Sequence, residues 1–373
     1  MNSSKKSNRF NIVDLFSGVG GLSYGFAKRS DFDVVAANEI LPAMANAYQR
    51  NHPHTKMYNC DIADFSGNLL RTDLGKVGES IHVVVGGPPC QAYSTVGKRL
   101  LGDPRSQLFK QYFRILEELQ PKIFVYENVR GIMSMDIFRK LIEEFSSLGY
   151  AVQYQLLNAA DFGVPQLRKR IIIVGTLDGY DFKYPNATHQ DPNQNSGLWG
   201  LDLPPWRTLG EAIGDLPKIE SGESAEHYAS DPQNEFQRKM RIQAPETLMD
   251  HNAASHNPRL IKLMEALPEG GGQRDLPKKL LPTSGFANTY ARLWWDRPCT
   301  TITRNLGTPS SSRCIHPHVA RGLTTREGAR IQGFPDHYMF SGSRSDRNLQ
   351  IGNAVPTLLS DAIAKQVLKT LKK

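Results

Sequence analysis

Short apolar runs alternate with segments of helical periodicity through the first half of the chain. Four runs are rich in β-branched residues and have the length of buried strands: Ile12–Phe16, Val34–Ala37, Ile81–Val85 and Ile123–Tyr126. Between the last two, Ser106–Leu119 repeats leucine and aromatic side chains at the spacing of one helix face. Strands that alternate with helices predict an α/β fold, in which helices cover both faces of a parallel sheet.

Two further apolar runs, Val152–Leu157 and Ile171–Gly175, follow each other closely. No helical pattern separates them, whereas parallel neighbours need a long crossover connection. We therefore expect an antiparallel hairpin at the edge of the sheet, which makes the predicted sheet a mixed one.

The character of the chain changes after about residue 180, where proline, glycine and polar residues become frequent. Helical periodicity is weak there apart from Asn257–Leu267, so a second, smaller and irregular domain is predicted. The final segment, Val355–Lys373, reads as a helix with an apolar stripe and lysines at its end. The predicted parts are residues 1–180, 181–343 and 344–373, and the last part is expected to pack back on the first.

Composition narrows the class of protein. Hydrophobic residues make up 39% of the chain, which suffices for a sizeable core. No apolar run reaches about 18 residues, so neither a signal peptide nor a membrane span is expected. The four cysteines, Cys60, Cys90, Cys299 and Cys314, form no CxxC pair, so no metal site is expected. Their thiols are expected to stay reduced, as in a cytoplasm.

Charge is distributed unevenly along the chain, whose formal net charge is +8. Residues 1–257 hold 27 basic and 29 acidic side chains, residues 258–347 hold 14 and 7, and residues 348–373 hold 4 and 1. A near-neutral body with a basic C-terminal third favours a polyanion that contacts one part of the molecule. A solvated basic face explains the charge equally well.

A glycine-rich turn follows the first predicted strand in DLFSGVGGLSYGF, Asp14–Phe26. Glycines let the backbone approach a ligand closely. Glu39 follows the next strand. A carboxylate at this position typically accepts hydrogen bonds from ribose hydroxyls. Phe16 is placed to stack on adenine, and Asp61 to accept a hydrogen bond from its amino group. An adenosine-containing cofactor is predicted, with a plain strand-to-helix turn as the alternative. The pattern GxGG is not the dinucleotide fingerprint GxGxxG.

The stretch GGPPCQAYS, Gly86–Ser94, holds Cys90 just beyond the carboxyl end of a predicted buried strand. Open α/β sheets bind their ligands at that edge. Two prolines fix the backbone, and the positive charges of Lys98 and Arg99 follow, which favours a thiolate. Cys90 is therefore predicted to be a nucleophile, although a lone cysteine is more often a small buried hydrophobe.

The stretch YENVRG, Tyr126–Gly131, places Glu127 and Asn128 at the end of the next predicted strand. Carboxyl ends of parallel strands share one edge, so Glu127 and Cys90 are expected to face one substrate. A helix N-cap explains Asn128 equally well.

In QLRKR, Gln166–Arg170, strand alternation puts Gln166, Arg168 and Arg170 on one face. Two guanidinium groups there suit a phosphate or a polar substrate edge. An exposed basic edge strand is the alternative.

Together these motifs resemble the DNA (cytosine-5)-methyltransferases, over nearly all of the chain outside residues 180–290. RPCTTITRN, Arg297–Asn305, then LTTREGARIQGFPDHY and finally QIGNAVP, Gln350–Pro356, complete the order of the family's motifs. The resemblance implies a Rossmann-like S-adenosylmethionine-dependent methyltransferase domain and a smaller target-recognition domain. The compact length is similar to that of prokaryotic restriction-modification enzymes.

The resemblance also implies roles for individual residues. Cys90 matches the nucleophile, Glu127 the acid that engages ring nitrogen 3 of cytosine, and Arg168 and Arg170 match residues that hold the flipped nucleotide. The residues that match the cofactor site are Phe16, Ser17, Gly18, Gly20, Gly21, Glu39, Ile40, Asp61, Ile62, Pro88, Asn353 and Ala354. Those expected to contact DNA are Gln91, Tyr93, Ser94, Lys98, Arg99, Gln166, Thr301 and Arg304.

The implied reaction explains these residue types. A thiolate added at carbon 6 makes carbon 5 of cytosine nucleophilic, and a neutral Glu127 bound to ring nitrogen 3 relieves the negative charge that builds on the ring. The base must leave the duplex to be reached. In the recognition region, Arg274, Lys278, Lys279 and Arg292 are candidate DNA contacts by charge alone.

Three alternatives stay open at this point. The scaffold also suits an RNA cytosine methyltransferase, although a variable region of roughly 120 residues favours duplex DNA. A nucleotide-dependent dehydrogenase with a catalytic cysteine is disfavoured by the absence of GxGxxG. A DNA-binding protein without activity is disfavoured by the intact Cys90 and Glu127. We expect a monomer in a prokaryotic cytoplasm, bound to nucleoid DNA, either alone or beside a restriction endonuclease that acts on the same site.

Overall fold

The computed structural model describes residues 9–89, 108–177, 179–193, 203–282 and 288–373. Two compact units divide the chain. The first comprises Met1–Leu157, Lys169–Asn186 and Leu359–Lys373, and the second comprises Asn158–Arg168 and Ala187–Leu358. The functional division into residues 1–180, 181–343 and 344–373 stays a prediction.

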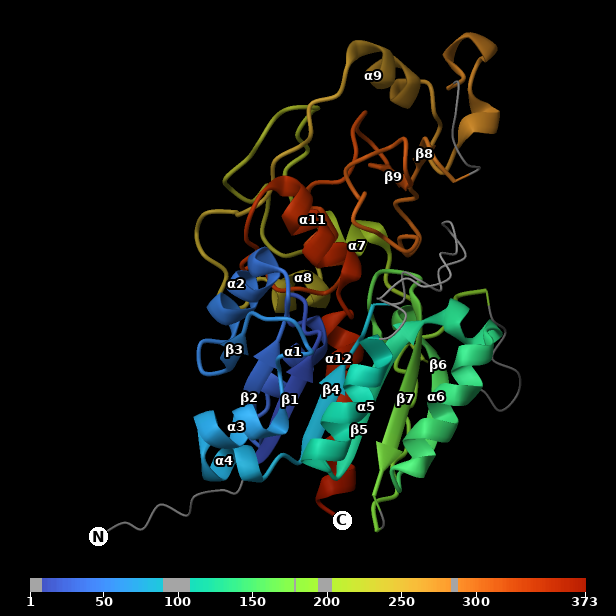
Figure 1. Cartoon of the computed structure of the whole chain (residues 1–373). Helices are drawn as coiled ribbons and strands as arrows, with labels where there is room; N and C mark the ends of the chain where they lie inside the picture. The colour runs from blue at the N-terminus through green and yellow to red at the C-terminus, as the bar shows by residue number, and fades with distance from the viewer. Residues whose placement is uncertain (1–8, 90–107, 178, 194–202, 283–287) are drawn as a thin grey trace. The chain divides into compact units, whose positions relative to one another are not determined.

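A seven-stranded sheet forms the centre of the first unit (Figure 1). Its strands, in spatial order, are β3 (Lys56–Tyr58), β2 (Phe32–Asn38), β1 (Phe10–Leu15), β4 (Val83–Gly86), β5 (Ile123–Val129), β7 (Lys169–Thr176) and β6 (Ala151–Asn158). Strands β1 to β5 pair in parallel, and β7 pairs with β5 antiparallel. The predicted mixed α/β sheet is confirmed, and β6 and β7 lie side by side at its edge as expected.

Helices cover both faces of this sheet. They are α1 (Gly21–Ala27), α2 (Pro42–Asn51), α3 (Gly67–Leu74), α4 (Lys76–Glu79), α5 (Leu108–Leu119), α6 (Asp136–Ser147) and α12 (Thr357–Leu371), together with the 3-10 turn η3 (Arg130–Ser134). On one face, α5 and α6 bury Tyr112 and Phe145 against Phe124 and Tyr126 of β5. This aromatic cluster follows from the helical spacing of apolar residues in α5.

The opposite face carries α1 and the C-terminal helix α12 (Figure 1). The backbone N–H of Gly25 donates to the Ser360 hydroxyl at 3.0 Å. A Cβ at residue 25 would lie 2.4 Å from the backbone nitrogen of Asp361, so only glycine permits this approach. Arg29 also binds the Asp361 carboxylate, at 2.7 Å. None of the helices in the described part of the chain combines the length and apolar character that a membrane span requires.

The second unit is mostly irregular, as its composition predicts. Its elements are η4 (Ala159–Phe162), α7 (Leu209–Ile213), α8 (Glu235–Met240), α9 (Pro258–Glu265), η5 (Gln273–Asp275), η6 (Lys278–Leu280), β8 (Ala291–Arg292), β9 (Arg313–Ile315), α10 (Thr325–Ile331) and α11 (Arg344–Asn353). The helix predicted over Asn257–Leu267 is α9, with Asn257 as its N-cap and a proline in its first turn.

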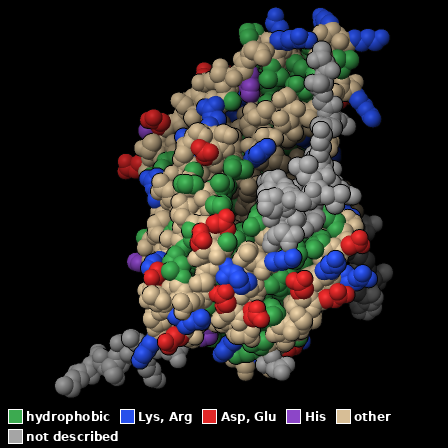
Figure 2. All heavy atoms as spheres, in the orientation of Figure 1, with side chains coloured by type: hydrophobic (Ala, Val, Ile, Leu, Met, Phe, Trp, Pro, Cys, Tyr) green, Lys and Arg blue, Asp and Glu red, His purple; other side chains and the backbone are tan. Residues whose placement is uncertain are grey.

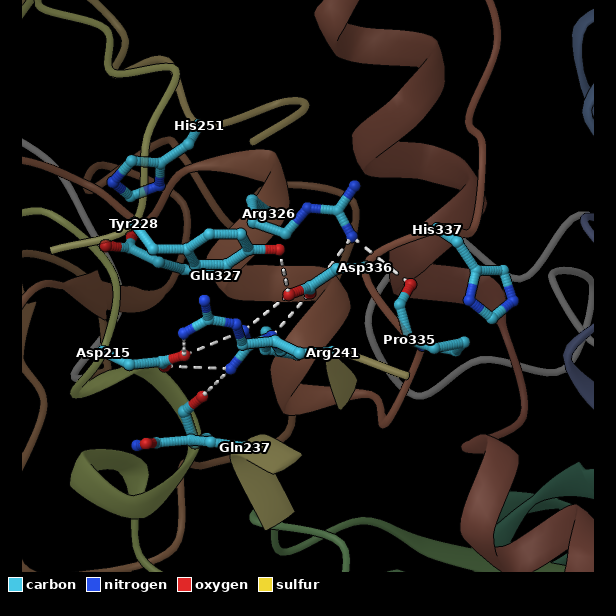
Figure 3. Close-up of polar contacts among 12 residues, drawn as sticks. Asp215, Tyr228, Gln237, Arg241, His251, Arg326, Glu327, Pro335, Asp336 and His337 are labelled. Carbon is cyan, nitrogen blue, oxygen red and sulfur yellow. Dashed lines mark hydrogen bonds and ion pairs between the residues drawn. The ribbon is translucent and has the colours of Figure 1, made fainter. Parts of the chain in front are cut away.

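Buried ion pairs hold the second unit together around α10 (Figure 3). The fully buried guanidinium of Arg330 lies 2.6 Å from the Asp336 carboxylate and 3.1 Å from that of Asp215. Asp336 also accepts a hydrogen bond from the Tyr228 hydroxyl at 2.7 Å. Nearby, Arg321 binds both oxygens of Glu327, at 2.8 and 2.9 Å. Several of the arginines that make residues 258–347 basic are therefore internal, which charge counting alone does not reveal.

Candidate active site

The strand order reverses between β1 and β4, and the loops that follow the two strands open at the carboxyl edge of the sheet. This is the usual ligand-binding edge of an open α/β sheet. Directly after β1, Phe16, Gly18 and Gly20 adopt positive φ angles of 52°, 56° and 93°. Such angles suit glycine and are rare for an aromatic residue, so the turn is a strained, specific structure of the kind that functional sites hold.

Glu39 supports this turn from the end of β2. Its Oε2 atom accepts a hydrogen bond from the Gly18 backbone N–H at 2.9 Å, and its Oε1 atom accepts one from Leu41 at 2.8 Å. Burial raises the pKa of the Glu39 carboxyl group, and the N–H groups of Leu41 and Gly18 lower it in part. Each carboxylate oxygen has two lone pairs, so Glu39 retains acceptor capacity for ligand hydroxyls.

Apolar surface lies beside this carboxylate. Ile40 is 57% exposed, and Phe16 is half-buried at the glycine turn. Asp61 is exposed after β3, and its carboxylate accepts from the Ala63 backbone N–H at 2.9 Å. Two apolar side chains and two carboxylates at one sheet edge fit the ring and the hydroxyl groups of an adenosine. The side chain of Ile62 is buried in the core, so it offers a ligand little surface.

Asp14 is a fully buried carboxyl group in β1, close behind the turn. Burial raises its pKa to about 7, an effect that the hydroxyl groups of Ser23 and Tyr48 oppose and the charge of Glu39 enhances. These hydroxyl groups hydrogen-bond to each other at 3.0 Å, and neither Asp14 oxygen accepts a hydrogen bond of normal geometry. A buried carboxyl group in such surroundings is easier to accommodate neutral than charged.

A second cluster lies where β4 and β5 end. Gly86 pairs with Tyr126, so Gly87 lies beside Glu127. A Cβ at residue 87 would lie 2.9 Å from Oε2 of Glu127, so a larger residue there would have to displace that carboxylate. From the antiparallel strand β7, Arg170 places its Nε atom 2.8 Å from Oε1 of Glu127. The structure thus brings together the carboxyl group, a guanidinium and the start of the loop that leads to Cys90.

Asn128 ties the two loops together. Its buried side-chain amide donates to the Pro88 carbonyl at 3.3 Å, and its side-chain oxygen accepts from the Val129 N–H at 2.8 Å. The N-cap role considered for it is not the one observed, because the 3-10 turn η3 has Val129 as its N-cap. Asn128 and Gly87 are absent from the predicted site, although both stand inside motifs that the sequence highlighted.

Arg168 has different surroundings from Arg170. It belongs to the second unit and is 1% exposed, and its guanidinium donates to the carbonyl groups of Ile302, Gly352 and Ala354 at 2.8 to 3.1 Å. Gln166 is also buried, and binds Gln332 at 3.0 Å. The alternation predicted along QLRKR is therefore observed. Arg168 and Gln166, however, bind groups inside the second unit, whereas Arg170 forms an ion pair with Glu127.

The remaining predicted residues divide into two sets. In the second unit, Thr301 and Arg304 are exposed, and the Thr301 hydroxyl donates to the Leu167 carbonyl at 2.6 Å. Asn353 ends α11 and Ala354 follows as its C-cap, so their cofactor role stays a prediction. Six predicted residues lie outside the described part of the chain: Cys90, Gln91, Tyr93, Ser94, Lys98 and Arg99. In the described residues, no cluster of His, Cys, Asp and Glu suits a metal ion.

A model of the C-5 cytosine-specific DNA methylase family matches residues 10–369 of the chain. The chain belongs to this family. It is 35% identical to the type II methyltransferase M1.HphI of Haemophilus parahaemolyticus, over 96% of this chain and 86% of that protein. It is 33% identical to the type II methyltransferase M.AgeI of Thalassovita gelatinovora, over 95% and 98% of the two chains.

A solved structure agrees with this membership. A putative DNA modification methyltransferase encoded within an E. coli prophage superimposes with a TM-score of 0.77 at 26% identity, covering 98% of this chain and all of that one. The resemblance seen in the sequence motifs is thereby confirmed. The protein is a DNA (cytosine-5)-methyltransferase, with DNA rather than RNA as its substrate.

Proposed function

We propose that this C-5 cytosine methylase takes its methyl group from S-adenosylmethionine and acts on a cytosine extruded from double-stranded DNA, with Cys90 as the nucleophile. One observation carries the proposal. Gly87, three residues before Cys90, lies so close to Glu127 that a side chain at residue 87 would meet Oε2 at 2.9 Å. The carboxyl group of Glu127 therefore lies beside the described residues that lead to Cys90, which supports a shared substrate for the two side chains.

In this proposal the Cys90 thiolate adds to carbon 6 of the cytosine ring, and a carbon–sulfur bond forms as the 5,6 double bond opens. Glu127 shares one proton with ring nitrogen 3 in a hydrogen bond, which stabilises the negative charge that develops there. Arg170 holds Glu127 through Oε1, at 2.8 Å, and so orients the carboxyl group in this proposal. Carbon 5 would then gain the methyl group, with a neutral thioether as the leaving group. Loss of the carbon 5 proton to water would return an electron pair to the ring, so that the 5,6 double bond re-forms and Cys90 leaves as a thiolate.

The residues at the ends of β1 to β3 support S-adenosylmethionine as the cofactor, which supplies an electrophilic methyl group when bound. The glycine turn admits a ligand close to the backbone. Glu39 would accept from ribose hydroxyls, Ile40 and Phe16 would contact the adenine ring, and Asp61 would accept from its amino group. Binding of the cofactor would extend contacts that Glu39 already makes to the turn at Gly18.

Trapping on modified DNA tests the nucleophile. DNA with 5-fluorocytosine at the target should form a covalent adduct with the wild-type protein, because fluorine cannot leave carbon 5 as a proton does. Cys90→Ser should form no adduct and lose turnover, while the matched variant Cys60→Ser should form the adduct normally. An adduct that maps to another cysteine would refute the assignment of Cys90. Bisulfite sequencing of DNA treated with the wild-type protein would give the target sequence in the same series.

The relatives named type II methyltransferases support a partner that acts on the same DNA. We propose a bacterial restriction-modification pair in the cytoplasm, in which this chain works as a monomer and protects the sites that an endonuclease cleaves. DNA methylated by the protein should then resist one restriction endonuclease encoded beside it. Sedimentation of the protein with one duplex should give a one-to-one complex.

A further inference from the structure

Strand β3 lies at one edge of the seven-stranded sheet and is only three residues long. Its parallel pairing with β2 ends at the pair Asn38 and Tyr58. Asp61, the proposed acceptor of the adenine amino group, is exposed and follows the last paired residue of β3 by three positions. Hydrophobic and acidic side chains lie next to each other on the surface of the first unit (Figure 2). A carboxylate on a surface loop beyond the sheet needs other contacts to hold it in place for a ligand.

The side chain of Asn38 supplies one set of these contacts. Asn38 ends β2 and is only 2% exposed. Its Nδ2 atom donates to the carbonyl oxygens of Cys60 at 3.0 Å and Tyr58 at 3.3 Å, and lies 3.6 Å from the Cys60 sulfur. A buried amide donor without an acceptor would cost free energy. The contact therefore fixes the backbone of the residue directly before Asp61.

The side chain of Asn59 makes the reciprocal contacts from the loop after β3. Its Nδ2 atom donates to the carbonyl oxygens of Glu39 at 2.8 Å and Ile40 at 3.1 Å. Glu39 and Ile40 are the proposed contacts of the ribose hydroxyls and the adenine ring. Each of the two segments is thus held by an amide that the other segment supplies. We call Asn38 and Asn59 the amide pair.

The amide pair is also connected to the glycine turn after β1. The Ser17 backbone N–H donates to the Asn38 carbonyl at 3.0 Å, and the Glu39 carboxylate accepts from the Gly18 N–H at 2.9 Å. The segments that follow β1, β2 and β3 therefore meet at two consecutive residues. The predicted cofactor site includes neither asparagine, although Asn38 directly precedes Glu39 in the sequence.

We propose that the amide pair positions the carboxylate of Asp61 for the adenine amino group, and thereby makes the cofactor site select adenosine over inosine. The proposal rests on the proposed function, because it concerns the same cofactor site. Inosine carries an oxygen where adenosine carries the amino group, and a site that is built to bind an N–H group rejects an analogue that lacks it. This selection requires that the carboxylate is held at a fixed place by its supporting residues.

Calorimetric binding of S-adenosylhomocysteine and S-inosylhomocysteine to the whole protein tests the positioning role. Neither ligand carries a transferable methyl group, so activity does not enter the measurement. One hydrogen bond to a charged group is worth about a factor of 10 in affinity, so the wild type should bind the adenosine compound about 10-fold more tightly. Asn59→Ala should bring this ratio to about 1. Because Asn59 is exposed, this variant leaves the core intact.

Asn11→Ala is the matched control. The Asn11 amide likewise donates to two carbonyl groups of another segment, those of Val77 at 3.4 Å and Ser80 at 2.9 Å. Asn11 lies near the amino end of β1, at the opposite edge of the sheet from the cofactor site. This variant loses a similar pair of contacts and should keep the wild-type ratio of the two affinities.

The outcomes separate this proposal from the proposed function. A wild type that binds neither ligand, or binds both equally, overturns the proposed cofactor site and the positioning role with it. A wild type with the expected ratio, beside an Asn59→Ala variant with the same ratio, overturns the positioning role alone. A ratio that falls equally in Asn59→Ala and Asn11→Ala also overturns it, because general loosening of the fold would then be the cause. Asn38→Ala, in a fold verified by circular dichroism, should lower the ratio as Asn59→Ala does, and an unchanged ratio refutes the role of Asn38.

Discussion

The carboxyl group of Asp14 should make the protein less stable as pH rises toward neutrality. Its pKa is raised to about 7 from the ordinary value of 3.8, because the side chain is fully buried. At pH values between these two, the native state holds a proton that the unfolded chain has released. The free energy of unfolding then falls as pH rises, and above pH 7 no further change arises from this group.

The magnitude follows from the size of the shift. One pKa unit corresponds to about 1.4 kcal/mol, so a rise of about 3 units is worth about 4 kcal/mol between pH 4 and pH 7. The isosteric variant Asp14→Asn cannot ionise at residue 14, so its free energy of unfolding does not fall with pH for this reason. Relative to the wild type, the variant should therefore gain about 1.4 kcal/mol for each pH unit in that window. Groups that titrate in the same way in both proteins cancel from the difference.

Urea unfolding at several pH values between 4.5 and 8 measures this difference. Because the substitution keeps the shape of the side chain, the two proteins should share one m-value, and their midpoints can be compared directly. The expected result is a pair of stability curves that diverge up to pH 7 and run parallel above it. Curves that run parallel from pH 4.5 onward would show that Asp14 ionises with an ordinary pKa, and the reasoning from burial would be refuted.

Other substitutions test the two loop clusters and the second unit. Glu127→Gln should slow single-turnover methyl transfer by about 100-fold or more, since a positioned acid contributes at least that much; a rate near that of the wild type would exclude this carboxyl group as the acid. Gly87→Ala should slow the same step at unchanged melting temperature, because the new methyl group meets Oε2 of Glu127, and a normal rate would contradict a shared substrate. Glu39→Gln should weaken S-adenosylmethionine binding by calorimetry, whereas an unchanged Kd would remove Glu39 from the cofactor site. Asp336→Asn should lower the free energy of unfolding by about 3 to 5 kcal/mol, because the buried cation of Arg330 loses a partner. Thermal unfolding measures this loss. A loss under about 1 kcal/mol would mean that the carboxylate of Asp215 alone balances the charge of Arg330.

Local patterns predicted the sheet well because burial and strand formation depend on short stretches. The apolar runs that predicted strands correspond to β1, β2, β4, β5, β6 and β7, with ends shifted by a few residues. The turn after β1 was also predictable, since glycine is the residue that positive φ angles favour. The positive φ of Phe16 was not, because the strain on an aromatic residue depends on the packing of the whole turn.

Long-range contacts limit what the sequence alone can predict. The close approach of residue 87 to the carboxylate of Glu127 joins two residues that are forty positions apart along the chain. The raised pKa of Asp14 depends on burial by several elements at once. Charge counting treated all basic side chains as surface groups, yet Arg292 and Arg330 are almost completely buried. A formal charge becomes informative about partners only after the internal arginines have been set aside.

The motif QLRKR shows how one pattern serves two purposes. The carbonyl groups that Arg168 binds belong to residues 302, 352 and 354, so this side chain joins three segments of the second unit that are far apart in sequence. Gln166 strengthens the same junction, because its side-chain oxygen accepts from the Ile302 N–H at 2.9 Å. Two residues after Arg168, the guanidinium of Arg170 instead meets a carboxylate at the end of β5. Alternation predicted that these side chains share one face, but their contacts differ. Arg168 binds backbone carbonyl groups in an irregular domain that has few helices and strands. Arg170 orients the carboxyl group of Glu127, the proposed acid. Substituting Arg168 should therefore impair the fold of the second unit first, and substituting Arg170 should impair the reaction first.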